Sequence, residues 1–198
     1  MATQSERTET TRKALIDAGR VLFAERGYAD VPVADIAALA QVTTGALYHQ
    51  FGSKEELFRA VYAELVGRVG ARILEERQTG GDPTLLGDCE AYIAACADPA
   101  FNRITIDGPA VVGWDQILDE AQSMIEVSLK DAHARGELAD APTAPLARML
   151  AAALKEAAVT IAKADGSRAA RKAARDSSRW LISGLVVSRT GGTSRARS

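Results

Sequence analysis

Residues 33–58, VADIAALAQVTTGALYHQFGSKEELF, constrain the fold of this chain more than any other stretch. Ile36 and Ala40, four positions apart, mark the apolar side of a short helix. The Gln-Val-Thr turn that follows directs Val42 inward and places Thr43 where it caps the next helix. Two short helices joined by so tight a turn predict a helix-turn-helix, the motif that presents one helix to the major groove of DNA.

Residues 44–50 form the second helix of this motif, with Leu47 and Phe51 four positions apart on its buried side. The other side chains are small or hydrogen-bonding and face outward, which lets a helix approach base edges in a groove about 12 Å wide. We therefore expect the chain to bind double-stranded DNA. The residues predicted to contact DNA are Thr43, Thr44, Gly45, Ala46, Tyr48, His49, Gln50 and Lys54.

A long helix follows the motif. Ser53 and Glu56 form an S-x-x-E capping box at its start, and we expect the helix to run to about residue 77. It would link the two parts of the chain, so that tilting it moves the recognition helix. Lys54 in its first turn can reach a phosphate, and the alternative is a solvated surface lysine. Tyr48 likewise either contacts DNA or packs as an aromatic side chain.

The same stretch resembles the DNA-binding domain of the tetracycline-repressor (TetR) family. The resemblance lies in Leu47-Tyr48, in Phe51 and in the SKEEL run at 53–57, which follow one another at the family's spacing. It implies an N-terminal DNA-binding domain and a C-terminal helical bundle with a cavity for a small molecule. It further implies a homodimer whose affinity for its operator falls when that molecule binds, by a shift between two populated arrangements.

The resemblance extends beyond the motif but has two departures. Residues 10–27 are similar to the family's first helix and end in Gly27, which is favoured at the left-handed end of a helix. Residues 107–114, DGPAVVGW, are similar to an element of one large group of TetR-type regulators. Gln41 stands where the family usually has Gly, so a left-handed backbone there is costly. Pro32 stands where the family usually has a phosphate-contacting Thr, and we assign no phosphate contact to it.

The composition favours an all-α protein. Aromatic residues are only 5% of the 198 residues, no window alternates as a strand does, and about nine helices are expected. The net charge of −2 argues against a non-specific nucleic-acid binder, so specificity would depend on pairing two subunits on one palindromic site. The expected organisation is a flexible N-terminal arm (1–8), a helix-turn-helix domain (9–69, motif 32–51), a helical effector-binding and dimerisation domain (70–188) and a disordered tail (189–198).

Glycine, proline and aspartate punctuate the C-terminal part into further helices. They are expected at 85–97, at 99–106, from Pro109 or Gly113 to Gly136, at 145–164 and at 167–187. Small residues on the last two would let them approach a partner's helices closely, as a four-helix interface between subunits requires; intramolecular packing is the alternative. The predicted dimer interface is Leu150, Ala153, Ala157, Ile161, Ala170, Ala173, Ser177, Leu181 and Gly184.

The predicted effector pocket draws on apolar positions of several helices, each of which is equally compatible with plain core. Its residues are Tyr62, Val66, Tyr92, Cys96, Ile104, Trp114, Leu118, Met124, Leu154 and Ala158. Asp107, Gln116 and Glu156 are polar residues that could orient a ligand. A mostly apolar lining suits a hydrophobic or amphipathic effector, whose identity the sequence does not give.

Other classes of function lack a sequence signature. No nucleophile, zinc-protease, phosphate-loop or dinucleotide motif occurs, so we expect no enzyme, no cofactor and no metal. Cys89 and Cys96 are two helical turns apart, roughly 10 Å along an axis, which is too far for a disulfide. A charged N-terminus and the lack of a long apolar run predict a cytoplasmic protein, associated with the nucleoid when operator-bound.

The leading interpretation is therefore a homodimeric repressor that a small molecule releases from a palindromic operator. The alternative is an architectural or division-type DNA-binding factor without a small-molecule switch. Activation in place of repression is also open, because the same docking serves both.

Overall fold

The structure is a computed structural model that describes residues 3–96, 98–138 and 141–185. These residues form nine α-helices, and the fold is all-α, as the sequence predicts. The helices are α1 Gln4–Arg26, α2 Val33–Leu39, α3 Thr44–Phe51, α4 Lys54–Gln78, α5 Leu85–Ala95, α6 Pro99–Val111, α7 Trp114–Ala134, α8 Thr143–Lys163 and α9 Arg168–Ser183. Within the same ranges, no helix is long and apolar enough to cross a lipid bilayer. The predicted tail at 189–198 lies outside the described residues.

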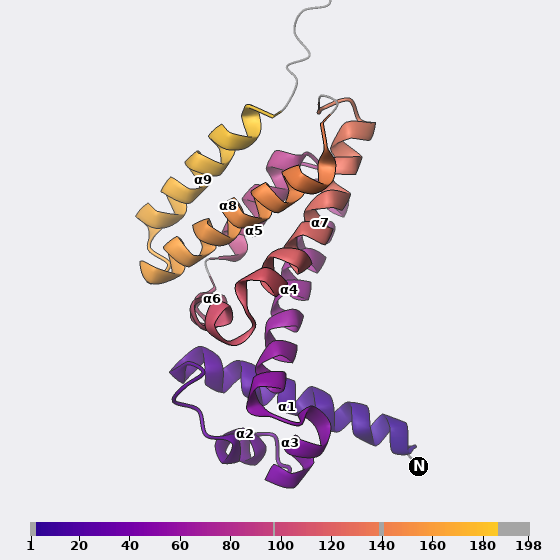
Figure 1. The fold of residues 1–198 in the computed structure, drawn as a ribbon, viewed down its shortest axis with the longest axis vertical. Helices are drawn as coiled ribbons and strands as arrows, with labels where there is room; N and C mark the ends of the chain where they lie inside the picture. Colours follow the sequence, from indigo (N-terminus) through magenta and orange to yellow (C-terminus); the bar gives the residue numbers. More distant parts are fainter. Residues whose placement is uncertain (1–2, 97, 139–140, 186–198) are drawn as a thin grey trace, which may run out of the picture.

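The helices gather into two parts that α4 joins (Figure 1). Helices α1 to α3 gather around the first turns of α4, whereas α5 and α6 pack against α4 in the other part and α9 packs on α5 and α8. Fully buried Phe23, Ile36 and Leu47 fill the interior of the N-terminal part together with Phe58 of α4. Because α4 contributes to both cores, a displacement at one of its ends is transmitted to the other.

Helix α1 is longer than the sequence predicts. It begins at Gln4, and Thr3 forms a complete capping box with Glu6, so residues 4–8 are helical where a flexible arm is expected. The reciprocal cap satisfies two backbone donors at the helix start, which explains why the helix extends this far. At the other end Gly27 closes it with φ +82°, as the sequence predicts.

Helix α6 also differs from the prediction, because it continues through the expected break at 107–109 to Val111. Pro109 lies inside this helix near its C-terminal end and removes one backbone N–H from the helical hydrogen bonds. The backbone N–H of Val112 donates to the Gly108 carbonyl at 2.7 Å, and Gly113 with φ +94° then ends the helix. Gly108 also allows close packing, since a Cβ there would lie 2.8 Å from the ring of Tyr62.

Candidate nucleic-acid interface and ligand cavity

The turn between α2 and α3 has the geometry that the sequence predicts, including the strained backbone of Gln41. Gln41 has φ +58°, a left-handed backbone that glycine adopts without a penalty. The N–H of Val42 donates to the Ala37 carbonyl at 2.9 Å and folds the turn back on α2. The hydroxyl of Thr43 accepts the N–H of Ala46 at 3.1 Å and caps α3. Pro32 precedes α2 without a side-chain cap, as expected of a proline.

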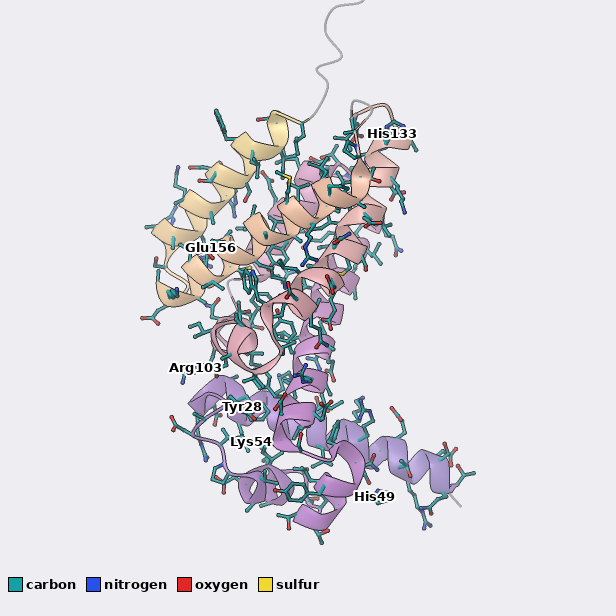
Figure 2. The ribbon with its side chains drawn as sticks, in the orientation of Figure 1. Tyr28, His49, Lys54, Arg103, His133 and Glu156 are labelled. Atoms are coloured by element: carbon teal, nitrogen blue, oxygen red, sulfur yellow. The ribbon has the colours of Figure 1, made fainter. Side chains whose placement is uncertain are left out.

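One face of α3 is buried and the other is open. Leu47 and Phe51 hold the helix against the domain core. On the opposite side Tyr48 is 51% exposed, and His49 lies on the outer surface of this part of the molecule (Figure 2). Thr43, Thr44 and Gly45 are also exposed, whereas Ala46 is half-buried. Thr43, Thr44, Gly45, Tyr48 and His49 are thus the predicted contact residues that are open to solvent at α3.

Two predicted DNA-contact residues have partners within the protein. The ammonium of Lys54 lies 4.5 Å from the centre of the Tyr28 ring and donates to the Ala29 carbonyl at 3.4 Å. Its partial burial lowers the pKa of its side chain, and nearby Asp30 opposes that change. The side-chain amide of Gln50 donates to the Thr8 carbonyl at 3.4 Å. Both side chains would have to exchange these contacts to reach a phosphate.

The C-terminal part contains a cavity of about 260 Å³ between α4, α5, α7 and α8, and this cavity is open to solvent on one side. Its lining is mostly apolar and includes Leu74 of α4, Leu85 of α5, Met124 of α7 and Leu154 of α8. A cavity of this size and character is typical of a small-molecule site. The concave shape and apolar lining indicate a ligand with substantial hydrocarbon surface.

A buried lysine brings positive charge to this cavity. Lys155 of α8 is only 5% exposed, and its ammonium lies 3.3 Å from the Tyr62 hydroxyl. The ammonium is also 5.5 Å and 5.6 Å from the ring centres of Tyr62 and Tyr92. Burial lowers the pKa of Lys155 to about 8, although Cys96 and Glu120 act in the opposite direction. An ammonium in this position is poorly solvated and would gain from an added anion.

An ion pair forms a second polar part of the wall. Arg77 of α4 donates to the buried Asp88 of α5 at 2.7 Å and to Asp131 of α7 at 3.2 Å. The hydrogen bond with Asp88 raises the pKa of Arg77 despite partial burial. A second, more polar hollow of about 330 Å³ shares Ile73, Arg77 and Asp88 with the first. The Arg77–Asp88 pair therefore separates the apolar cavity from a polar surface hollow.

Hydrogen bonds connect the cavity-bearing part to the helix-turn-helix. The guanidinium of Arg59 in α4 donates to the Val112 carbonyl at 3.0 Å and to the Gln116 side chain at 2.6 Å. The backbone N–H of Tyr28, after α1, donates to the Asp107 carboxylate of α6 at 2.7 Å. Figure 2 shows Tyr28 at this junction, with Arg103 of α6 nearby. A movement of α7 at the cavity can therefore reach α4 through Arg59, and α6 is tied to the end of α1 through Tyr28.

Comparison with known proteins places this architecture in a family. The profile described as "Tetracyclin repressor-like, C-terminal domain" matches residues 83–185, and that of "Bacterial regulatory proteins, tetR family" matches residues 15–61. A solved structure of a TetR-family transcriptional regulator from Pectobacterium atrosepticum is 30% identical, with a TM-score of 0.80 over 94% of this chain and 99% of that chain. The chain belongs to the TetR family.

Two curated relatives show how far the sequence similarity extends. The TetC protein of transposon Tn10 from Escherichia coli is 32% identical over 116 residues, which are 58% of this chain and 59% of that protein. The A-factor receptor protein of Streptomyces griseus is 28% identical over 147 residues, 70% of this chain and 49% of that protein. The chain thus spans less than two thirds of either relative's length.

The ten pocket residues predicted from the sequence do not all reach the cavity of this TetR-family protein. Tyr92, Met124 and Leu154 line it. Tyr62, Cys96, Ile104, Leu118 and Ala158 are buried outside its lining, Val66 is half-buried and Trp114 is 38% exposed.

The three polar residues expected to orient a ligand also lie outside the lining. Asp107 and Gln116 accept hydrogen bonds from Tyr28 and Arg59 instead. Glu156 is exposed on α8 (Figure 2). Asp107 lies on α6, which contributes no residue to the lining, and Gln116 and Glu156 lie on parts of α7 and α8 outside it.

Sequence reasoning missed the polar groups that do line the cavity. Lys155 continues an otherwise apolar helical stripe of Ala151, Ala158 and Ala162 on α8. A charge within such a stripe is the signal that was available, because charged residues are rarely buried without a reason. Asp88 is the corresponding case on α5, where it lies on the same side as Leu85.

The predicted dimer residues divide between the core and the surface. Leu150 and Ile161 are buried within the protomer, so they belong to its own core and present no surface to a partner. Ala157 and Ala170 are half-buried, and the exposed members are Ala153, Ala173, Ser177, Leu181 and Gly184. Met149 and Trp180, which were not predicted, are 71% and 82% exposed on α8 and α9.

Proposed function

We propose that this TetR-family protein is a homodimeric transcriptional repressor that binds a palindromic DNA operator and leaves it when a small molecule binds. The observation that carries the DNA-binding part is the open face of α3, held outward by Leu47 and Phe51 and capped by Thr43. A helix presented in this way can enter the major groove and bring Thr44 and Tyr48 to base edges or phosphates. DNA binding places the site of action in the bacterial cytoplasm.

Exposed apolar side chains on α8 and α9 support the proposed dimer. Trp180 is 82% exposed, and Leu181 and Met149 add apolar surface on the same two helices. Exposed apolar surface of this kind on neighbouring helices is typical of a protein–protein interface. Two recognition helices related by a two-fold axis would read half-sites roughly 34–36 Å apart, or a multiple of this spacing.

The small-molecule switch rests on the cavity and its connections. A ligand in the 260 Å³ cavity would contact α4 and α7, and both helices are tied to the helix-turn-helix side through Arg59. The ligand would favour the arrangement of subunits that cannot span two half-sites, which lowers operator affinity. The same cavity favours this function over an architectural factor without an effector, which would have no need of a ligand-sized space.

A mobility-shift titration tests the DNA-binding function. The purified protein is titrated on the DNA upstream of its own gene at two salt concentrations, and on a site obtained by random-sequence selection. We expect saturable binding that weakens as salt rises. A Thr44→Ala and Tyr48→Phe double variant should bind at least ten-fold more weakly at unchanged thermal stability, because both side chains are exposed. No sequence-selective binding to either DNA would overturn the proposal.

A further inference from the structure

The cavity is lined by two cations, and only one of them has a counter-ion. Arg77 pairs with Asp88 and Asp131. In the described part of the chain, no carboxylate lies within 4.0 Å of the Lys155 ammonium. The ammonium donates a hydrogen bond to the neutral Tyr62 hydroxyl. With 5% exposure, Lys155 has almost no water to solvate its charge. It is therefore a buried cation that lacks an anion.

The groups that face Lys155 do not supply that anion. Tyr62 comes from α4 and Tyr92 and Cys96 come from α5. Burial raises the pKa of the Cys96 thiol to about 12 and raises those of both tyrosines, so all three are neutral near pH 7. Glu120 of α7 favours the charged lysine from beyond ion-pair distance. The Glu120 carboxylate reduces the free-energy cost of burying the Lys155 ammonium but does not remove it.

A second buried polar group at the same cavity is also without a partner. The Tyr92 side chain is 8% exposed, and its hydroxyl makes no hydrogen bond of good geometry among the described residues, with only the weakly hydrogen-bonding Cys96 thiol beside it. A buried hydroxyl without an acceptor typically costs about 1–3 kcal/mol in proteins, so such groups often mark the place of an absent ligand. Lys155 and Tyr92 both line the cavity. Together they offer an ammonium and a hydroxyl to a single acceptor group.

The rest of the cavity lining is mostly apolar and suits the hydrocarbon part of a ligand. Away from these two residues, the wall is formed by side chains such as Leu74, Met124 and Ile125. We propose that the effector is an amphipathic carboxylic acid, with its carboxylate on Lys155 and Tyr92 and its apolar portion against α4 and α7. This inference rests on the proposed function, because it names the chemical class of the molecule that would act at the cavity.

Direct ligand binding tests the inference independently of DNA. Octanoate, decanoate and 4-phenylbutyrate are titrated into the full chain by calorimetry, alongside 1-octanol, 1-decanol and decyltrimethylammonium. We expect at least one of the acids to bind ten-fold or more tightly than the alcohol of matching length, and the ammonium compound not to bind. Equal affinity for acid and alcohol, or no binding of any of the three acids at 1 mM, would overturn the inference.

Three variants locate the carboxylate. Lys155→Met should abolish the preference for acid over alcohol. It should keep the affinity for the alcohol, since methionine retains the apolar volume of the side chain. Lys163→Met, on an exposed lysine at the end of the same helix, should leave the preference unchanged. Tyr92→Phe should weaken the binding of the acid several-fold and leave the binding of the alcohol unchanged. A preference that persists in the Lys155→Met protein would place the carboxylate elsewhere and contradict the inference.

The pH dependence adds a readout that a purely structural lysine would not give. Wild-type affinity for decanoate should fall as the pH rises from 7 to 9, because the ammonium loses its proton across this range. The Lys155→Met protein should show no such fall. Because operator binding is measured separately, a protein that binds DNA but no acid contradicts only this inference. One that binds the acid but no DNA contradicts only the proposed function.

Discussion

The backbone N–H of Tyr28 and the carboxylate of Asp107 are joined by a 2.7 Å hydrogen bond that spans 79 positions of the chain. Tyr28 also packs against Phe23 and Phe58, with ring centres 5.8 Å and 5.2 Å away. The bond therefore ties the aromatic core of the helix-turn-helix part to α6. A ligand-driven displacement of α6 must either carry Tyr28 with it or break this contact.

Asp107→Ala should lower the free energy of unfolding by about 1–2 kcal/mol, because a partly buried backbone donor loses its acceptor. Urea denaturation measures the change. Asp119→Ala is the control, since Asp119 is an exposed carboxylate that pairs with Arg148, and such surface pairs contribute about 0–1 kcal/mol. Equal effects of the two substitutions would show that the Tyr28–Asp107 bond has no special part in holding the two regions together.

Gln41→Gly should stabilise the protein by about 0.5–1 kcal/mol. The left-handed backbone of Gln41 is unfavourable for a residue with a Cβ, and glycine removes that cost while losing some entropy on folding. Ala71→Gly, at an exposed site within α4, should instead destabilise by about 0.5–1 kcal/mol. Urea denaturation measures the change in stability of both variants relative to wild type. A loss of stability in the Gln41→Gly protein would refute the prediction of strain.

The helix-turn-helix could be predicted from the sequence because its determinants are local. The cap of Thr43, the turn at Gln41 and the buried pair Leu47 and Phe51 all act within a few residues of one another. The strain at Gln41 was likewise foreseen from a single departure from the family pattern. The fold class followed from similar local signals, namely caps, glycine ends and helical stripes.

The cavity and the helix ends depend on tertiary packing, which a sequence does not display. Pro109 was expected to break α6 earlier, but the helix, which packs against α1 and α8, continues past it with the loss of a backbone hydrogen bond. On α8, apolar residues occur on more than one side, so Leu150 could not be distinguished from exposed Ala153 by pattern alone. The position of Lys155 in an apolar stripe could have indicated that it is buried, but its neighbours Tyr62 and Tyr92 come from other helices and could not be read from that stripe.

Lys155→Met should stabilise the unliganded protein by about 1–3 kcal/mol at pH 7, since it removes a buried cation that has no counter-ion. The folded-state pKa of about 8 lies below the ordinary lysine value of 10.5, so folding disfavours the charged form. The cost is fully present below pH 8, where both states are protonated, and declines as the pH rises toward 10.5.

The difference in stability between the Lys155→Met protein and wild type should therefore shrink between pH 7 and pH 10. Urea denaturation of both proteins across this range measures it, and taking the difference cancels the titration of tyrosines common to both. A wild type that is more stable than the variant at pH 7 would mean that Lys155 contributes to folding in place of serving a ligand.

Trp180→Glu should convert the proposed homodimer to monomer. An 82% exposed indole on α9 is the largest apolar group available to a partner, and its burial is worth about 1.5–3 kcal/mol. Glutamate removes that contribution and adds a charge whose desolvation opposes association, so the dimer dissociation constant should rise at least 100-fold. Sedimentation equilibrium over a concentration series measures the dissociation constant.

Leu39→Glu provides the control. It places the same charge on a half-exposed apolar site of α2, far along the chain from α9, and should leave the association unchanged. A Trp180→Glu protein that remains as dimeric as wild type would move the interface away from this part of α9. Operator affinity would then have to depend on a different pairing of the two recognition helices.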